Sequence, residues 1–535
     1  GNNQFWRPQE GEQTIRIVPT SDGDPFKDYW FHYNLGKNNG FLSPKKNFGE
    51  NDPLDDFIRN LFHEGTENSI KMAKNLMART TILSHDWVGG EGGKGGGGGR
   101  GLGGRWIATP GVGVFPRYMD VHAPAGLGVI KTVGMHGGDR WEAICGEVYT
   151  QVSPPEFWHA EARLAALERL RFGVTTGVSL LGGGDTIMRS DHPDYAAAHC
   201  RGVLEVGTRS VVAIGPTRAP HPLTYADWES GNRRPYSVSF AQQFDTSKAV
   251  ADDWHNTHAG RINIAMLYPV LRDEHERDMA AQDYADACEQ VRAVRAYARD
   301  KGLIFTQDGH WRGSIRRAQA LGLLGPDALL SHCIDLHDDE IALAAETDTK
   351  IAHNPSANAS IAGRCPATEM MEIGVCVALG SDATAPDRSG DMFRHMQQAM
   401  HYHRRHFRDA DVLPIGRVLE MCTIDGAKAL GMDERIGSLE VGKAADIVTL
   451  DLARPHLQPG NMPAHRLVCF ANGNDVSNVM VGGEMVLRDA RATRLDEAEV
   501  LRDAAAEAAL MVERMGSAQD LALPSDFWGR KESQL

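Results

Sequence analysis

The feature that most constrains this chain is a long alternation of apolar, strand-like runs with helical runs between residues 106 and 430. Apolar side chains repeat with helical spacing in, for example, residues 155–171, 279–301 and 313–321. Eight runs are predicted as strands, at 113–122, 173–180, 210–215, 261–270, 302–307, 328–332, 350–353 and 375–380. This alternation favours an α/β fold of the (β/α)8 TIM barrel kind, with a doubly wound open sheet as the structural alternative.

Two shorter regions follow the predicted barrel of residues 106–430. Short strands and turns, such as 446–451 and 479–487, predict that residues 431–490 form part of a small and incomplete β-sandwich. Residues 491–535 are expected as a C-terminal helical tail, with an Ala/Glu/Arg-rich helix at 497–515.

A glycine-rich stretch precedes the barrel. Twelve of the sixteen residues from 89 to 104 are glycine, which predicts that residues 80–105 are a linker. A phosphate-binding loop would need a GxxxxGK[ST] pattern between a strand and a helix, and the stretch has neither the pattern nor the flanking elements.

The first 79 residues form a short, β-rich and aromatic segment. Strands are predicted at 14–18 and 29–33, and their aromatic side chains suit either the core of a small β domain or the stacking of single-stranded bases. The segment resembles the start of phage single-stranded-DNA-binding proteins, over about 75 residues. The resemblance lies in the sequence FWRPQEGEQTIRIVPTSDGDPFKDYWFHYNLGKNNGFLSPKKNFGE. Because the chain starts with Gly1 and changes character abruptly, we hypothesise that two unrelated reading frames are joined here, which sequencing across codons 75–110 would test.

Charge and composition narrow the class of protein. The 535 residues carry a formal net charge of −15, which argues against nucleic-acid or anionic-membrane binding by the whole chain. There is no apolar run of membrane-spanning length and no apolar signal core at the start, so a cytoplasmic protein is the default expectation. The eight cysteines include no CxxC pair, which argues against a thiolate zinc site.

Histidines and carboxylates gather at the predicted strand ends. In a parallel barrel these ends meet at one mouth, where active sites lie. The strand-end residues in chain order are Asp120, His122, Gln307, His310, His332, His353 and Asp382. Such donors suit a divalent metal, which lowers the pKa of a bound water. Asp382 is the strongest candidate, because a carboxylate after a buried strand needs a metal or another partner.

Four segments of the chain are SHCIDLHDDEI, KIAHNPSANASI, GVCVALGSDATAPDRSGDMFRHM and TIDGAKALGMDERIGSLEVGKAADIVTLD. They resemble the amidohydrolase superfamily, closest to its chlorohydrolase and deaminase branch. The resemblance covers about 380 residues and implies a (β/α)8 barrel with one zinc or iron ion. It implies that His122 and Asp382 are metal ligands and that Asp382 also has a catalytic role. It further implies that His332 moves protons, and that His353 and the following Asn354 line the substrate.

Three positions depart from the family pattern. Pro124 stands where the second histidine of an HxH pair is expected, Gln307 where the ligand of the fifth strand is expected, and His310 where that ligand's glutamate partner is expected. We therefore expect Gln307 to be a weak ligand, and His310 either to supply the missing imidazole or to act as acid or base.

The predicted function is a metal-dependent hydrolase that acts on carbon–nitrogen bonds of a small cyclic or heteroaromatic substrate, like a deaminase or chlorohydrolase. The alternatives are a catalytically impaired amidohydrolase relative and single-stranded-DNA binding through the first segment. The expected partner is a small-molecule substrate, with neither a membrane nor nucleic acid for the chain as a whole. Assembly as a homo-oligomer stays open.

Overall fold

The computed structural model describes residues 29–35, 38–42, 80–83, 107–109, 112–135, 140–183, 187–229, 231–357, 363–385, 387–440, 442–523 and 527–529. The predicted strand at 14–18 and the glycine-rich linker at 89–104 lie outside these residues. No helix in the described ranges combines the length and the apolar character that a membrane span requires.

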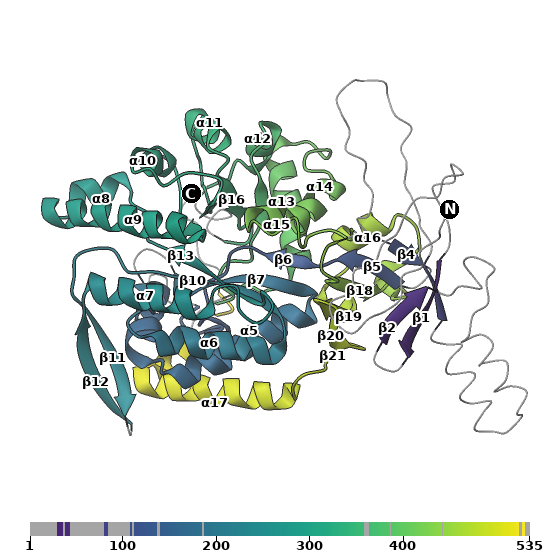
Figure 1. The fold of residues 1–535 in the computed structure, drawn as a ribbon, viewed down its shortest axis with the longest axis horizontal. Coiled ribbons are helices and arrows are strands. Elements are labelled where there is room, and N and C mark those ends of the chain that lie inside the picture. Colours follow the sequence, from purple (N-terminus) through teal and green to yellow (C-terminus); the bar gives the residue numbers. More distant parts are fainter. Residues whose placement is uncertain are drawn as a thin grey trace, which may run out of the picture.

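The centre of the fold is an eight-stranded parallel sheet (Figure 1). Its strands in chain order are β6 (Tyr118–Asp120), β7 (Val174–Leu180), β10 (Arg209–Ile214), β13 (Ile262–Leu267), β14 (Ile304–Gln307), β15 (Ala328–Ser331), β16 (Lys350–His353) and β17 (Val377–Leu379). Strands that are neighbours in the chain are also neighbours in the sheet, with β6 and β17 at its two ends.

Backbone hydrogen bonds close this sheet into a barrel. The amide of Val121 donates to the carbonyl of Leu379 at 3.1 Å, and the amide of Asp382 donates to the carbonyl of His122 at 2.9 Å. The first and last strands therefore meet at their carboxyl ends. The (β/α)8 prediction is confirmed and the open doubly wound sheet is excluded.

Helices surround the barrel, as Figure 1 shows. They are α5 (Pro155–Arg171), α6 (Pro193–Val206), α7 (Phe240–Trp254), α8 (Asp273–Asp278), α9 (Ala281–Lys301), α10 (Ser314–Ala320), α11 (Asp338–Glu346), α12 (Ala367–Glu372), α13 (Met392–Phe407), α14 (Ile415–Met421) and α15 (Ile424–Ala429). The predicted helix at 155–171 has the bounds of α5. The predicted helix at 279–301 starts at Ala281 instead, because the chain is extended at Met279 and Ala280 after the short helix α8.

A second sheet, antiparallel and six-stranded, packs beside the barrel in the order β21-β20-β19-β18-β5-β4. Its strands are β4 (Ile107–Thr109), β5 (Val112–Pro116), β18 (Ile447–Asp451), β19 (Val476–Val481), β20 (Glu484–Arg488) and β21 (Arg491–Ala492). The run 113–122, expected as one barrel strand, thus divides between two sheets. The division falls at Arg117, whose fully buried guanidinium pairs with Asp446 just before β18.

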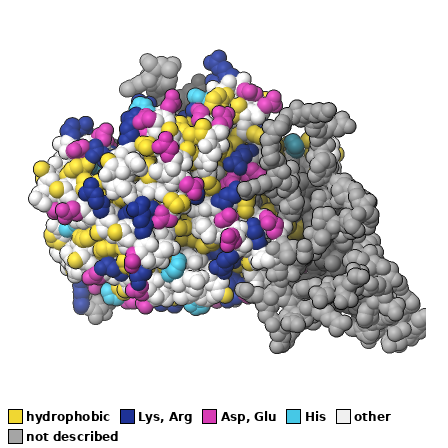
Figure 2. Space-filling model, turned by 45° about the horizontal axis from the view of Figure 1, so that its top comes forward, with side chains coloured by type: hydrophobic (Ala, Val, Ile, Leu, Met, Phe, Trp, Pro, Cys, Tyr) yellow, Lys and Arg dark blue, Asp and Glu magenta, His cyan; other side chains and the backbone are white. Residues whose placement is uncertain are grey.

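The C-terminal helix α17 (Glu497–Met515) returns from this sheet to lie against α5 (Figure 1). Arg163 of α5 pairs with Glu499 at 3.0 Å and with Asp503 at 2.8 Å. The helix predicted at 497–515 is confirmed with these bounds. On the face seen in Figure 2, acidic and basic side chains are interspersed over the described surface.

The other α-helices and strands of the described residues are smaller. They are the helices α4 (Arg140–Glu147) and α16 (Pro463–Cys469), the hairpins β8–β9 (Gly182–Gly183, Ile187–Met188) and β11–β12 (Leu223–Glu229, Asn232–Val238), and the antiparallel sheet β2-β1-β3 (Asn38–Leu42, Tyr29–Leu35, Thr80–Leu83).

Candidate metal centre and active site

Three side chains from distant parts of the chain converge at the carboxyl ends of the barrel strands. One ligand atom each from His122, His332 and Asp382 lies within 4.8 Å of the other two, and all three residues are buried. His122 follows β6, His332 follows β15 and Asp382 follows β17. Two ring nitrogens and one carboxylate at such distances form a donor set that fits a divalent zinc or iron ion.

The backbone at this site is held in sparsely populated conformations. His332 has φ 68° and Asp382 has φ 61°, both in the left-handed region, where a side chain costs about 1–2 kcal/mol. Such strain persists only where the surrounding structure fixes it, and it is concentrated at functional sites.

Gly380 permits the close packing behind these residues. An added Cβ at this position would collide with Oδ1 of Asn354 and would lie 2.8 Å from Cβ of His122. The glycine therefore lets the turn that carries Asp382 approach the turn that carries His122.

Asp308, which directly follows β14, lies between the two histidines of the group. Its Oδ1 is 2.9 Å from Nε2 of His332, 3.1 Å from Nε2 of His122, and accepts a hydrogen bond from the Ser331 hydroxyl at 3.1 Å. Burial would raise the pKa of Asp308, but the two imidazoles outweigh it and hold that pKa well below its ordinary value. Burial likewise would lower the pKa of His122, and the charge of Asp308 raises it above its ordinary value instead.

The sequence did not single out Asp308, although a carboxylate directly after an apolar strand was the signal that pointed to Asp382. The positions that correspond to the family's fifth-strand ligand and its glutamate partner are 307 and 310, and Asp308 lies between them.

Gln307 lies at the end of β14 with its amide group fixed. Its Nε2 donates to the carbonyls of Tyr268 at 3.3 Å and Pro269 at 3.1 Å, while its Oε1 is buried and has no hydrogen-bond partner. This arrangement leaves only an amide oxygen as a donor to a metal.

His310 is close to the group but is not one of the three residues brought together. Its Nδ1 lies 2.9 Å from the hydroxyl oxygen of Ser314. That oxygen accepts a hydrogen bond from the amide of Trp311, and the Ser314 hydroxyl can therefore donate its own hydrogen to Nδ1 of His310. The remaining ring proton then sits on Nε2, which is buried without a partner. Burial, together with Arg272 and His332, lowers the pKa of His310 to about 3, so this ring is neutral at pH 7.

His353 and Asn354, the predicted substrate-lining residues, follow β16 and are fully buried. The side-chain nitrogen of Asn354 lies 3.4 Å from Nε2 of His332, whereas Nε2 of His353 faces Nε2 of His403 from α13 at 3.3 Å. Burial and the neighbouring His403 and His332 lower the pKa of His353 well below its ordinary value. Asn354 thus borders the three-residue group, and His353 lies behind it.

Asp120, two residues before His122, binds Ser381, the residue before Asp382, and Arg169. Its Oδ1 accepts the amide of Ser381 at 2.8 Å, and its Oδ2 accepts the Ser381 hydroxyl at 2.7 Å and two hydrogen bonds from Arg169. The carboxylate is fully buried.

Pro124 borders a small enclosed cavity of about 30 Å³. Glu161, Arg169 and His199 also line it, and both ring nitrogens of His199 are buried without hydrogen-bond partners.

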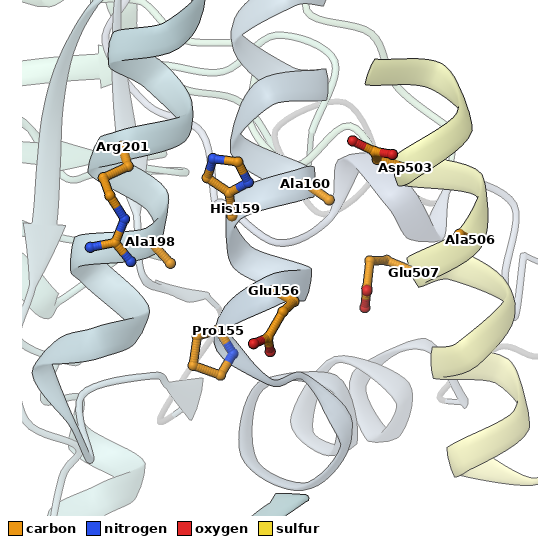
Figure 3. Close-up of a pocket in the computed structure, with 9 residues that line it drawn as sticks. All are labelled: Pro155, Glu156, His159, Ala160, Ala198, Arg201, Asp503, Ala506 and Glu507. Carbon is orange, nitrogen blue, oxygen red and sulfur yellow. The ribbon is translucent and has the colours of Figure 1, made fainter. Parts of the chain in front are cut away.

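A wider groove of about 450 Å³ lies outside the barrel between α5, α6 and α17 (Figure 3). It contains none of the strand-end residues and is lined by charged side chains, including Glu156, Asp503 and Glu507.

In a closed (β/α)8 barrel the active site lies at the carboxyl ends of the strands, and histidines with an aspartate at that place suit a metal ion that activates water. Residues 121–486 match the model of the Amidohydrolase family, and the chain belongs to that family. It is accordingly a hydrolase of the class that acts on carbon–nitrogen bonds other than peptide bonds.

Several relatives are named as deaminases. The 5'-deoxyadenosine deaminase of Methanothermobacter thermautotrophicus is 30% identical over 359 residues, which cover 66% of this chain and 77% of the relative. The 5'-deoxyadenosine deaminase of Methanosarcina barkeri is 35% identical over 364 residues, which cover 67% and 80%.

Solved structures share the fold. An adenosine deaminase from Xanthomonas campestris with bound zinc aligns with a TM-score of 0.63 at 22% identity, covering 76% of this chain and 87% of that chain. An atrazine chlorohydrolase from Arthrobacter aurescens complexed with zinc aligns with a TM-score of 0.59 at 18% identity, covering 74% and 88%.

Proposed function

We propose that this chain hydrolytically deaminates the purine ring of an adenosine-type nucleoside, with a zinc or iron ion at the His122–His332–Asp382 group. The convergence of these three buried side chains at the barrel mouth carries the proposal. The 5'-deoxyadenosine deaminase relatives favour a nucleoside substrate among the cyclic and heteroaromatic compounds that the family accepts.

A divalent ion would supply a water of lowered pKa at this site. His122 and Asp382 would hold it from opposite ends of the barrel sheet. His332 is suited to move a proton between the attacking water and the leaving amine, because its Nε2 already exchanges a hydrogen bond with Asp308 at 2.9 Å. His310 stays neutral and would donate a hydrogen bond through Nε2 to the substrate.

The experiment is to load the purified full chain with zinc or iron, measure metal content, and assay ammonia release. The substrates would be 5'-deoxyadenosine, 5'-methylthioadenosine and adenosine, with a chlorinated triazine to test the chlorohydrolase alternative. About one metal per chain and ammonia release from a nucleoside are expected. A chain that holds no metal in metal-replete buffer would refute the proposal.

The impaired-relative alternative rests on Pro124, which cannot ligate a metal. If the loss of that histidine has abolished binding, Pro124→His should raise the metal content sharply above that of the wild-type chain. Equal metal content in the two proteins would count against this alternative.

The resemblance of residues 1–79 to phage single-stranded-DNA-binding proteins is retained as a separate proposal. It predicts that the full chain retards a single-stranded oligonucleotide in a gel at low salt, and that added salt releases it. A chain that leaves the oligonucleotide unshifted at low salt would remove this activity. We also propose that the chain assembles as a homo-oligomer, which light scattering of the purified protein would test. We propose a cytoplasmic location as well, which cell fractionation would test.

A further inference from the structure

We infer that Asp308 is a metal ligand of this site, and that it fills the ligand place at the end of β14 where Gln307 stands, so that His332 remains available for proton transfer. The inference rests on the proposed function, because it concerns the metal of the same site. It assigns to the ion one imidazole and two carboxylates: His122, Asp308, whose Oδ1 is 3.1 Å from the His122 ring nitrogen, and Asp382, whose ligand atom lies within 4.8 Å of that of His122.

The first observation is the relation of Asp308 to His122. Nε2 of His122 and Oδ1 of Asp308 are 3.1 Å apart, and both residues are buried. Metal–ligand bonds of about 2.1 Å place neighbouring ligand atoms roughly 3.0–3.4 Å apart in octahedral or tetrahedral geometry. The two atoms therefore already have the separation of two ligands of one ion.

The second observation concerns the other nitrogen of His332. If Nε2 of His332 bound the metal, its ring proton would have to sit on Nδ1, and Nδ1 is buried without a hydrogen-bond partner. Histidine ligands almost always donate that second N–H to a carboxylate, a carbonyl or a water. With the proton on Nε2, by contrast, the ring donates to Asp308 at 2.9 Å. The surroundings thus favour the tautomer that cannot bind a metal through Nε2.

The third observation is the charge balance. Asp308 and Asp382 are both buried, and two carboxylates together neutralise one divalent cation in a place where uncompensated charge is costly. The chain has Pro124 and Gln307 at two positions where its family resemblance leads us to expect imidazoles. A carboxylate directly beside Gln307 restores an anionic donor at the same strand end.

The test compares zinc binding by the wild-type chain with that of Asp308→Asn and His332→Gln, two substitutions that preserve side-chain size. The proteins would be stripped with a chelator and titrated with zinc alone, and bound zinc would be measured by elemental analysis. We expect Asp308→Asn to bind zinc at least about tenfold more weakly. His332→Gln should stay within about twofold of wild type while losing ammonia release. Asp348→Asn is the matched control, because Asp348 is an exposed partner of Lys350, and it should behave like wild type.

X-ray absorption spectroscopy of the zinc-loaded wild-type protein is the second measurement, and it does not depend on whether a variant folds. It should report one imidazole and otherwise oxygen ligands. Two or more imidazoles, wild-type zinc affinity in Asp308→Asn, or a large loss of zinc in His332→Gln would each overturn the assignment while leaving the proposed function intact. A wild-type chain that binds no zinc or iron would overturn both.

Discussion

Nε2 of His122 and Oδ1 of Asp308 face each other at 3.1 Å, although their residues are 186 positions apart in the chain. A ring nitrogen and a carboxylate oxygen so placed are stabilised by a proton or by a cation between them.

A metal that binds only the folded protein raises its stability. Zinc at about 100 times its dissociation constant should add about 2.7 kcal/mol to the free energy of unfolding. Thermal unfolding of the stripped wild-type chain should therefore shift upward with added zinc, and Asp382→Ala should abolish the shift. The exposed Asp348→Asn variant should keep it. An equal upward shift in Asp382→Ala would mean that zinc binds elsewhere.

Gly380→Ala should damage both stability and the site. The added Cβ would collide with the Asn354 amide and crowd His122. Overpacking of this kind costs about 1–3 kcal/mol, and we expect a loss of that size in the free energy of unfolding together with weaker zinc binding.

Gly416→Ala is the matched control for that substitution. Gly416 is the second residue of α14, and an added Cβ there would meet nothing within 4 Å. The same chemical change should leave stability unchanged or raise it by less than about 1 kcal/mol, because alanine suits a helix better than glycine. Urea denaturation of both variants measures the contrast, and a loss of similar size at both positions would contradict it.

The contact between Asp120 and Ser381 should couple the two ends of the barrel sheet energetically. Ser381→Ala should cost about 1–3 kcal/mol, since it leaves a buried acceptor less well satisfied. Asp120→Ala should cost about 3–5 kcal/mol, because it also removes the carboxylate that faces the Arg169 guanidinium. In a double-mutant cycle followed by urea denaturation, the double variant should lose less than the sum. Strict additivity would show that the two side chains act independently.

Glu161→Gln should stabilise the protein at neutral pH. Burial raises the pKa of Glu161, an effect that hydrogen bonds from the amides of Gly126 and Gly128 offset only in part. Since a carboxyl with a raised folded pKa is harder to ionise in the folded chain, its ionisation costs stability as the pH rises above the unfolded value of about 4.3. The gain from Glu161→Gln should therefore be present at pH 7 and vanish below about pH 4.

Denaturation of the Glu161→Gln variant at the two pH values is the measurement. Glu372→Gln, at an exposed position at the end of α12, serves as the control and should change stability little at either pH. A gain of the same size at pH 4 and pH 7 would argue that the effect is steric and not electrostatic.

Much of the barrel was predictable because each strand carries its own local signal. Runs such as 350–353 and 302–307 are apolar, short and followed by polar residues, and the structure ends β16 and β14 at His353 and Gln307 as expected. The split of 113–122 was not predictable in this way. Both halves are apolar and extended, and only the distant partner Asp446 of Arg117 marks where the chain passes from one sheet to the other.

The sequence predicted which residues lie at the site better than it predicted the distances between their side chains. His122, His332 and Asp382 stand at strand ends, and parallel strands must bring their carboxyl ends together. Asp308 has the same sequence signal as Asp382, a carboxylate directly after a strand, so its presence at the barrel mouth was predictable. Its distances to His122 and His332 were not, because they depend on the rotation of each strand about its axis, which spacing along the chain does not encode.

The closure of the barrel has a consequence for its synthesis. Asp120 and its partner Ser381 are separated by 261 residues, which a ribosome adds in some tens of seconds at about 5–20 residues per second. Throughout that interval the emerging chain carries an acidic group whose final partner does not yet exist, beside a first strand that has no neighbour on one edge. A helper that shields nascent chains would act on this protein during that interval, and a message truncated before codon 381 would yield a product with no route to the closed ring.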